Sequence, residues 1–180
     1  MLINQLNDMI KKSAFNKQKY VVNIPVRRLI PGVMLYMNEN VEPISKNLFD
    51  IGVPEFQRSN DKWSRNMQIS FVENVIKGYN SKIQLYTLNQ SVLVDCKILD
   101  GLQRTTSLTK FIDGEFNIFN DEFSFNDIKD NILRGLNVNI GLEIFSFKDQ
   151  NEAIDFYVEM NENITHSAED INKALKFKTK

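Results

Sequence analysis

A short stretch, ILDGLQRTTSL, carries residue types that bind phosphate, and it lies where a predicted strand meets a predicted helix. The backbone N–H groups at the start of a helix have no partners within the helix and bind anions, phosphate above all. Gly101 lets a ligand approach this backbone closely, and Arg104 adds a planar donor that suits phosphate oxygens. Thr105 and Thr106 supply hydroxyl groups nearby. We therefore predict a phosphate site at these four residues.

A simpler role for the same arginine is also open. In this interpretation Asp100 has no role beyond that of the N-cap of the helix, and Arg104, one turn later, is simply its ion-pair partner. A cation is disfavoured at this positive end of the helix dipole, so folding alone does not account for an arginine here. The sequence leaves both interpretations open.

A second Gln-Arg pair, Gln57-Arg58 in VPEFQR, also lies just ahead of a predicted helix. Two guanidinium groups at two helix starts can converge on one polyphosphate or on a phosphodiester backbone. The alternative is two separate surface ion pairs, each contributing about 0–1 kcal/mol. We favour convergence, which makes Gln57, Arg58 and Arg104 parts of one phosphate-binding site.

Hydrolysis of a phosphate ester needs a cation, a positioned water molecule and often Mg²⁺. The arginines can neutralise developing charge, and Gln103 can orient the water molecule. Asp100 or Glu55 can act as the general base or as a ligand for Mg²⁺. The predicted catalytic residues are therefore Asp100, Gln103 and Arg104, and no further metal-ligand spacing stands out.

Three segments of the chain resemble, in the same order, those of a known family. They are VPEFQRSNDKWSRNMQISFVENVIKGY, ILDGLQRTTSLTKFIDGEF and FYVEMNENITHSAEDINKA. They are similar to the N-terminal domain of GmrSD-type restriction endonucleases, the DGQQR-box proteins of the ParB/sulfiredoxin-like superfamily. The resemblance spans roughly residues 45–175 and includes the proline-x-phenylalanine-Gln-Arg box, the tryptophan after it, the Asp-Gly-x-Gln-Arg box and the asparagine segment around Asn161.

The resemblance implies a nucleotide-binding and often nucleotide-hydrolysing module of bacterial or phage DNA-defence systems, which can be coupled to DNA cleavage. Carried over residue by residue, it places a nucleoside triphosphate at Asp100, Gly101, Gln103 and Arg104, with Gln57 and Arg58 beside them. The chain departs from the family at Leu102, where the family usually has glutamine. If that glutamine acts directly in the chemistry, this protein binds without turnover. If Leu102 points into the core, the change is silent.

Three functions agree with these residues. The first is a nucleotide-binding, NTP-hydrolysing domain of a GmrSD-like nuclease system, which would have a nuclease subunit as its partner. The second is a non-catalytic DNA-binding or regulatory module on the same fold, with the same arginines against backbone phosphates. The third is a phage-encoded decoy or inhibitor that binds a host protein. The intact boxes favour the first function, whereas Leu102, the small size and the near-neutral charge favour the other two.

The length favours one domain, or one domain with an appendage, and the composition is ordinary for a soluble globular protein. The chain has 180 residues and a formal net charge of −1, so no global positive field indicates nucleic acid, although a local basic patch stays open. A single cysteine, Cys96, fits a reducing compartment. No apolar run approaches the roughly 18 residues of a membrane span, and the N-terminus lacks a signal-peptide pattern. We expect a cytoplasmic protein of a bacterial or phage-infected cell.

Hydrophobic periodicity predicts the elements that must position the candidate residues. Helices are predicted over 2–14, about 63–79, 101–112, 149–161 and from Ser167 onwards; strands are predicted over 20–24, 82–88, 92–99 and 140–147. The middle two strands form a predicted hairpin, and Pro31-Gly32 predicts a turn. The expected fold is α+β (mixed α/β): a ParB/sulfiredoxin-like domain over 45–180 with a small mixed sheet, flanking helices and an extra C-terminal helix. An N-terminal extension over 1–44, a helix plus a short strand, precedes it.

Apolar residues recur four apart along the predicted helix over 63–79, from Trp63 to Tyr79. This spacing predicts the face that packs into the core, and the alternative is an aromatic platform for a base. Cys96 lies between apolar positions and is predicted to be a small buried side chain.

Overall fold

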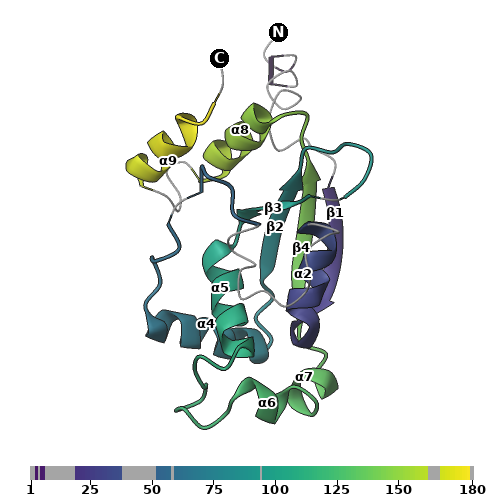
Figure 1. Ribbon diagram of the computed structural model, residues 1–180, viewed down its shortest axis with the longest axis vertical. Coiled ribbons are helices and arrows are strands. Elements are labelled where there is room, and N and C mark those ends of the chain that lie inside the picture. Colours follow the sequence, from purple (N-terminus) through teal and green to yellow (C-terminus); the bar gives the residue numbers. More distant parts are fainter. Residues whose placement is uncertain are drawn as a thin grey trace.

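The computed structural model describes residues 19–37, 52–57, 59–93, 95–161 and 167–178, together with residues 3, 5 and 6. In these residues a four-stranded sheet is flanked by helices (Figure 1). The strands are β1 (Lys19–Pro25), β2 (Lys82–Thr87), β3 (Lys97–Asp100) and β4 (Asn139–Ser146). The helices are the 3₁₀-helix η1 (Val26–Arg28), α2 (Leu29–Met37), α4 (Arg65–Ile76), α5 (Leu102–Ile112), α6 (Phe125–Ile128), α7 (Ile132–Gly135), α8 (Gln150–Asn161) and α9 (Ala168–Leu175).

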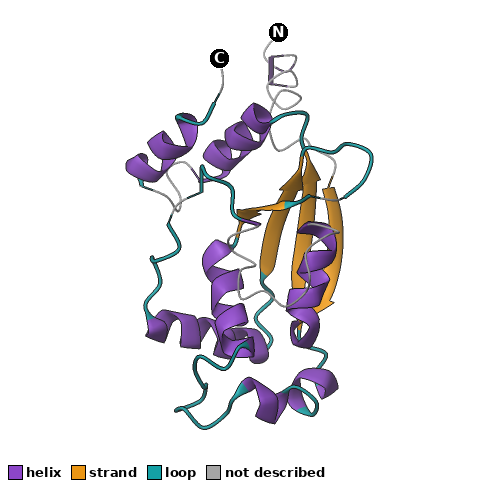
Figure 2. Cartoon of the chain, in the orientation of Figure 1, coloured by secondary structure: helices purple, strands orange, loops and turns teal. Residues whose placement is uncertain are grey.

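The sheet is mixed, with the strand order β1-β4-β2-β3. β4 pairs antiparallel with β1 and parallel with β2, and β2 pairs antiparallel with β3. A parallel pair needs a crossover, and the chain makes it through β3, α5, α6 and α7 before it returns as β4. β3 lies at one edge of this order and leads from Asp100 through Gly101 into α5. Figure 2 shows the sheet and the helices around it in the orientation of Figure 1. The predicted mixed sheet with flanking helices is confirmed.

Two hydrophobic clusters cover opposite faces of the sheet. Along β4, Leu142 belongs to the larger cluster and Phe145 to the smaller one, and side chains at odd spacing on a strand point to opposite faces. The larger cluster includes Val72 of α4 and Leu108 of α5, whereas the smaller includes Ile154 of α8. In Figure 1, α8 and α9 lie together at the upper end of the sheet. The two helices nearest the candidate residues are thus held on one face by the main core.

Local sequence signals set the ends of α4 and α5. The side chain of Ser64, the N-cap of α4, accepts a hydrogen bond from the Met67 N–H, and Gly78 follows the helix with a φ of 101°. Gly114 follows α5 with a φ of 76°. Glycine adopts such angles without steric cost, so both glycines stop their helices as predicted. The strands predicted over 20–24, 82–88 and 140–147 and the helices predicted over 149–161 and after Ser167 are also confirmed.

The strand predicted over 92–99 is shorter than expected. It begins at Lys97 as β3, although its antiparallel pairing with β2 confirms the hairpin. The Cys96 N–H donates to the carbonyl oxygen of Tyr36 at 2.8 Å. Because this N–H bonds a residue of α2 and not a strand, pairing with β2 begins only after Cys96. Cys96 itself is buried, as predicted.

Part of the segment assigned to an N-terminal extension belongs to the same sheet and core. β1 pairs with β4 from Lys19 to Pro25, and Leu29 and Val33 of α2 belong to the larger hydrophobic cluster. The helix predicted over 2–14 lies almost entirely outside the described residues, and so does the boundary at 44–45.

The turn predicted at Pro31-Gly32 is wrong, because both residues lie inside α2. Pro31 is the third residue of this helix, where its missing N–H would have no partner within α2 in any case. Gly32 is there for space: a Cβ at this position would lie 2.7 Å from Cγ2 of Ile24, which is 6% exposed. The glycine thus reports a close contact between α2 and β1.

We expect Gly32→Ala to lower the free energy of unfolding by about 1–3 kcal/mol, because the added methyl group overpacks the core against Ile24. Gly135→Ala is the matched control: a Cβ at Gly135 in α7 has no heavy atom within 4 Å, so this change should be neutral or slightly stabilising. Urea denaturation of the two variants measures both effects. Equal stability of the two variants would contradict the proposed contact.

Candidate functional site

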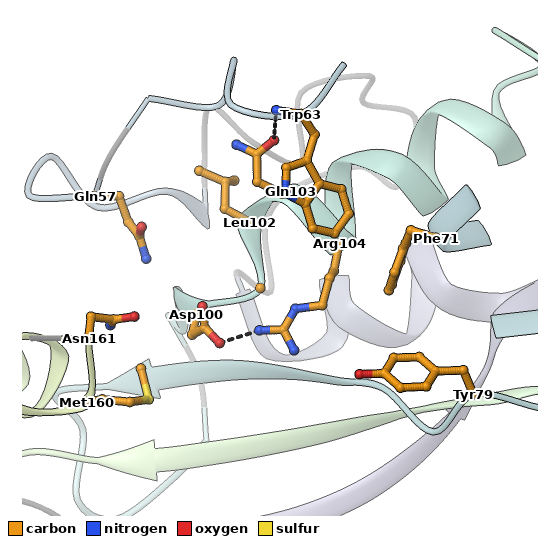
Figure 3. Close-up of a pocket in the computed structure, with 11 residues that line it drawn as sticks. Gln57, Trp63, Phe71, Tyr79, Asp100, Leu102, Gln103, Arg104, Met160 and Asn161 are labelled. Atoms are coloured by element: carbon orange, nitrogen blue, oxygen red, sulfur yellow. Dashed lines mark hydrogen bonds and ion pairs between the residues drawn. The ribbon is translucent and has the colours of Figure 1, made fainter. Parts of the chain in front are cut away.

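A cavity of about 540 Å³ opens in front of the N-terminus of α5 (Figure 3). Its wall comes from the segment before α4, from α4 and the residues after it, from the β3–α5 junction and from the end of α8. The lining residues are Gln57, Trp63, Phe71, Tyr79, Asp100, Gly101, Leu102, Gln103, Arg104, Met160 and Asn161. The structure therefore brings residues of all three family-like segments to one place.

The start of α5 is shaped by a glycine that no other residue can replace without strain. Gly101 is the N-cap of α5 and has a φ of 94°, in the left-handed region. A Cβ there would lie 3.3 Å from Cα of Ile83 and 3.4 Å from Nε of Arg104. The first hydrogen bond of the helix runs from the Thr105 N–H to the Gly101 carbonyl. The N–H groups of the first turn are thus left for an anion.

Arg104 and Asp100 form an ion pair at the cavity wall, and their side chains are 25% and 28% exposed. The ion pair that the simpler interpretation of Arg104 predicts is therefore present. The N-cap of α5 is Gly101, however, and not Asp100. The pair holds the guanidinium at the helix start, where the dipole disfavours it, and leaves it partly accessible from the cavity. A phosphate group would compete with the carboxylate of Asp100 for the same donors.

Two buried glutamines hold the two Gln-Arg segments against each other. The Gln57 Nε2 group donates to the carbonyl oxygens of Ile98 at 3.2 Å and Leu99 at 2.6 Å, at the end of β3. In the other direction, the Gln103 Nε2 group donates to the Ser59 carbonyl at 3.4 Å, and Gln103 Oε1 accepts from the Trp63 N–H at 3.3 Å. We call these contacts the reciprocal glutamine contacts. Since both polar atoms of Gln103 bind the backbone, its first role is to position the 59–63 segment rather than a water molecule.

The predicted threonine ligands do not reach the cavity. The Thr105 hydroxyl donates to the Gly101 carbonyl at 2.9 Å, and the Thr106 hydroxyl lies 2.7 Å from the Leu102 carbonyl and 2.8 Å from Oδ1 of Asn60. Both threonines are buried and neither lines the cavity. The prediction that these two threonines bind phosphate is wrong. A hydroxyl group in a helix readily donates a hydrogen bond to the carbonyl oxygen one turn back. Thr106 adds a further link between α5 and the 59–63 segment.

Two other predicted site residues, Glu55 and Arg58, have different outcomes. Glu55 is exposed in the turn closed by the hydrogen bond from the Gln57 N–H to the Pro54 carbonyl, and it does not line the cavity. Arg58 lies outside the described residues, so its convergence with Arg104 stays a prediction.

Leu102, the departure from the family pattern, is 4% exposed and belongs to the main hydrophobic cluster. It also forms part of the cavity wall (Figure 3). Its burial in the core agrees with the alternative under which the change is silent, whereas its place in the cavity wall leaves the loss of turnover a prediction.

The aromatic stripe predicted to face the core is only partly buried. Tyr79 is 61% exposed and Met67 is 50% exposed, whereas Val72 and Val75 are buried. A spacing of four residues moves the position about 40° further around a helix at each step, so such a stripe winds away from the core. Trp63, Phe71 and Tyr79 instead form one wall of the cavity.

The rings of Trp63 and Phe71 are in contact, with centroids 5.3 Å apart. Trp63 and Tyr79 lie outside α4, before its N-cap Ser64 and after Gly78, so the helical spacing of the sequence does not place them on the core face. Met160 and Asn161 complete the opposite side, and Asn161 Nδ2 donates to the Tyr157 carbonyl at 2.8 Å. The cavity thus has apolar aromatic surface beside a cation.

The described residues do not form a magnesium site of their own. Among the residues that the structure describes, Asp100 is the one carboxylate that lines the cavity, and it is paired with Arg104. In the part of the chain that the structure describes, no three His, Cys, Asp or Glu side chains are grouped to hold a metal ion.

Burial and the charge of Asp95 raise the pKa of the Cys96 thiol to about 12, so this buried thiol stays protonated at neutral pH.

No family model matches the chain, and neither the curated proteins nor the solved structures give a match. None of the described helices is both long and apolar enough to span a bilayer.

The reciprocal glutamine contacts predict a specific local effect. Gln103→Met leaves the Trp63 N–H and the Ser59 carbonyl without their partner, which should lower the free energy of unfolding by about 1–3 kcal/mol. In this variant, hydrogen exchange of the 59–63 amides should be faster than in the wild type, whereas exchange in α8 should stay the same. Gln90→Met, at an exposed position, is the control. Unchanged protection of residues 59–63 would refute the positioning role of Gln103.

Proposed function

We propose that this protein binds a nucleotide whose phosphates lie at the N-terminus of α5. The supporting observation is that one cavity contains the open first turn of α5, the glycine that allows close approach, and the partly exposed guanidinium of Arg104. Helix N-termini and arginine side chains both bind phosphate oxygens in proteins. Here both point to the same volume.

The ion pair with Asp100 prepares Arg104 for this role. Because the carboxylate already fixes the guanidinium at the cavity, less side-chain entropy is lost when a phosphate arrives. The phosphate then exchanges with the carboxylate as the acceptor. A ligand with more than one negative charge competes better for the guanidinium than a monoanion does, and this favours di- and triphosphates.

The size and wall of the cavity favour a nucleotide over inorganic phosphate. A volume of about 540 Å³ lies within the range of about 300–1,000 Å³ that is usual for small-molecule sites. The wall formed by Trp63, Phe71 and Tyr79 gives apolar surface on which a base or a ribose can rest. Free phosphate would use neither.

Binding is supported more fully than hydrolysis. Of the predicted catalytic residues, Gln103 is held by two backbone groups and Asp100 by Arg104. Asp100 could act as a base only after a phosphate has released it from Arg104. We therefore propose that Arg104 neutralises the charge of the bound phosphates.

The resemblance to GmrSD-type proteins gives this proposal its biological setting. We propose that the chain is a nucleotide-binding module of a DNA-defence nuclease system, with a ParB/sulfiredoxin-like fold. The support is that the boxes of the resemblance, distant in sequence, line one cavity. A nuclease subunit would then be the partner that reads the nucleotide-bound state.

One observation supports the second candidate, a DNA-binding module. Lys62, Lys173 and Lys176 line a depression of about 650 Å³ beside Ser59, together with Glu169 and Asp170. Lys173 is partly engaged, because its Nζ donates to the Gln57 carbonyl at 2.6 Å. Such a group could contact backbone phosphates of a strand that passes the cavity.

The nucleotide proposal is tested by titrating each of four NTPs into the protein by isothermal titration calorimetry. Arg104→Ala should weaken binding about 10- to 100-fold, the usual loss for a charge-assisted hydrogen bond. Asp100→Asn should strengthen it, because the competing carboxylate is removed. Arg65→Ala is the control, since Arg65 pairs with Glu115 at the surface and does not line the cavity.

Equal affinities of wild type and Arg104→Ala would reject this site. Arg58→Ala in the same series tests convergence, because a loss as large as that in Arg104→Ala requires both guanidinium groups to reach the phosphates.

The DNA candidate predicts a different dependence on salt. If it is correct, a single-stranded oligonucleotide binds with an affinity that falls steeply as salt rises, and Lys62→Ala and Lys176→Ala each lower the slope by about one. We expect instead that an NTP binds more tightly than the oligonucleotide at physiological salt, and that Lys62→Ala leaves NTP affinity unchanged. Fluorescence anisotropy of a labelled oligonucleotide measures the slope.

A further inference from the structure

The side-chain amide of Gln57 has a fixed orientation. Its Nε2 group donates to two backbone carbonyl oxygens, those of Ile98 and Leu99. A rotation of the amide by 180° would place Oε1 against both carbonyl oxygens, which is repulsive. Gln57 therefore presents an acceptor, and only an acceptor, on its other side.

This acceptor has no partner among the described residues. Gln57 is 4% exposed and lines the cavity, and no described group donates to its Oε1. In Figure 3 the nitrogen end of this amide points towards Asp100 and Asn161, and the oxygen lies on the other side of the amide. A buried side chain with an unused acceptor facing a cavity is suited to a donor supplied by a ligand.

The groups beside Gln57 make this end of the cavity unsuitable for phosphate. Asp100, which also lines the cavity, carries a carboxylate. Amide and carboxylate oxygens both repel phosphoryl oxygens and both accept N–H or O–H donors. The cavity thus has a cationic region at Arg104 and an accepting region at Gln57. The sequence-based assignment of Gln57 as a phosphate ligand does not fit this polarity.

We propose that Gln57 is a specificity-determining residue whose Oε1 accepts a hydrogen bond from the nucleoside part of the ligand. The phosphates lie at Arg104, and the donor is an amino group or ring N–H of the base or a hydroxyl of the ribose. This inference rests on the proposed nucleotide binding and adds to it a requirement for a donor at the end of the ligand remote from the phosphates.

The expected effect is selective loss of affinity. A site that is built to accept a hydrogen bond discriminates against an analogue that lacks the donor, because the acceptor then loses its partner in the complex. We expect removal of the one correct donor to weaken binding about tenfold or more, and removal of any other donor to change it about twofold or less.

The experiment compares the tightest-binding NTP with analogues that each lack one donor: the base amino group or ring N–H, the 2′-hydroxyl or the 3′-hydroxyl. Inorganic tripolyphosphate is the probe without a nucleoside. Dissociation constants are measured by calorimetry for wild type, Gln57→Met and Gln90→Met. Gln90→Met is the control for the same glutamine-to-methionine change, because Gln90 is exposed and does not line this cavity.

We expect one analogue to bind about tenfold more weakly than its parent in wild type and in Gln90→Met, and equally well in Gln57→Met. Discrimination that persists in Gln57→Met would overturn the inference, and so would analogues that all bind wild type equally. If Gln57→Met does not fold, the wild-type series alone decides. Tripolyphosphate binding as tight as the NTP would overturn the inference but keep the phosphate site, whereas no binding of either probe would end both.

Discussion

The reciprocal glutamine contacts are the constraint on which the cavity depends. Gln57 binds the end of β3 just before the second Gln-Arg pair, and Gln103 binds the segment just after the first. Each glutamine thus fixes the backbone of the other junction. Because the contacts involve backbone groups, they set the position of the chain and do not depend on which side chains line the space between. The repeated dipeptide is explained first as architecture: its glutamines assemble the cavity at the start of α5.

The cavity that results has a definite polarity. The guanidinium of Arg104 and the first turn of α5 attract negative charge, whereas the oxygens of Asp100 and Gln57 face the same space as acceptors. A simple anion would satisfy only the first group, and a neutral donor only the second. A ligand with phosphates at one end and hydrogen-bond donors at the other satisfies both. The wall of Trp63, Phe71 and Tyr79 adds apolar surface between solvent and these polar groups.

The sequence predicts the elements well and the contacts of individual side chains poorly. The periodicity of α4 and α5 and the glycines after them are local signals, and they are confirmed. Thr105 and Thr106 were expected at the ligand, but a helical hydroxyl bonds its own backbone, a choice that residue type does not reveal. The glutamine contacts join positions distant in sequence, so no local pattern indicates them. The Pro31-Gly32 pair predicts a turn, but Gly32 lies inside α2, where the missing side chain allows close contact with Ile24 of β1.

The most direct test of the account is a crystal structure of the protein with a non-hydrolysable nucleoside triphosphate analogue. The account predicts phosphoryl oxygens against the guanidinium of Arg104 and the N–H groups that begin α5, with Asp100 displaced from the arginine. It predicts that the contacts of Gln103 to the 59–63 segment stay unchanged, since they form the site before the ligand arrives. A nucleotide bound elsewhere, with Arg104 still paired to Asp100, would contradict the central claim.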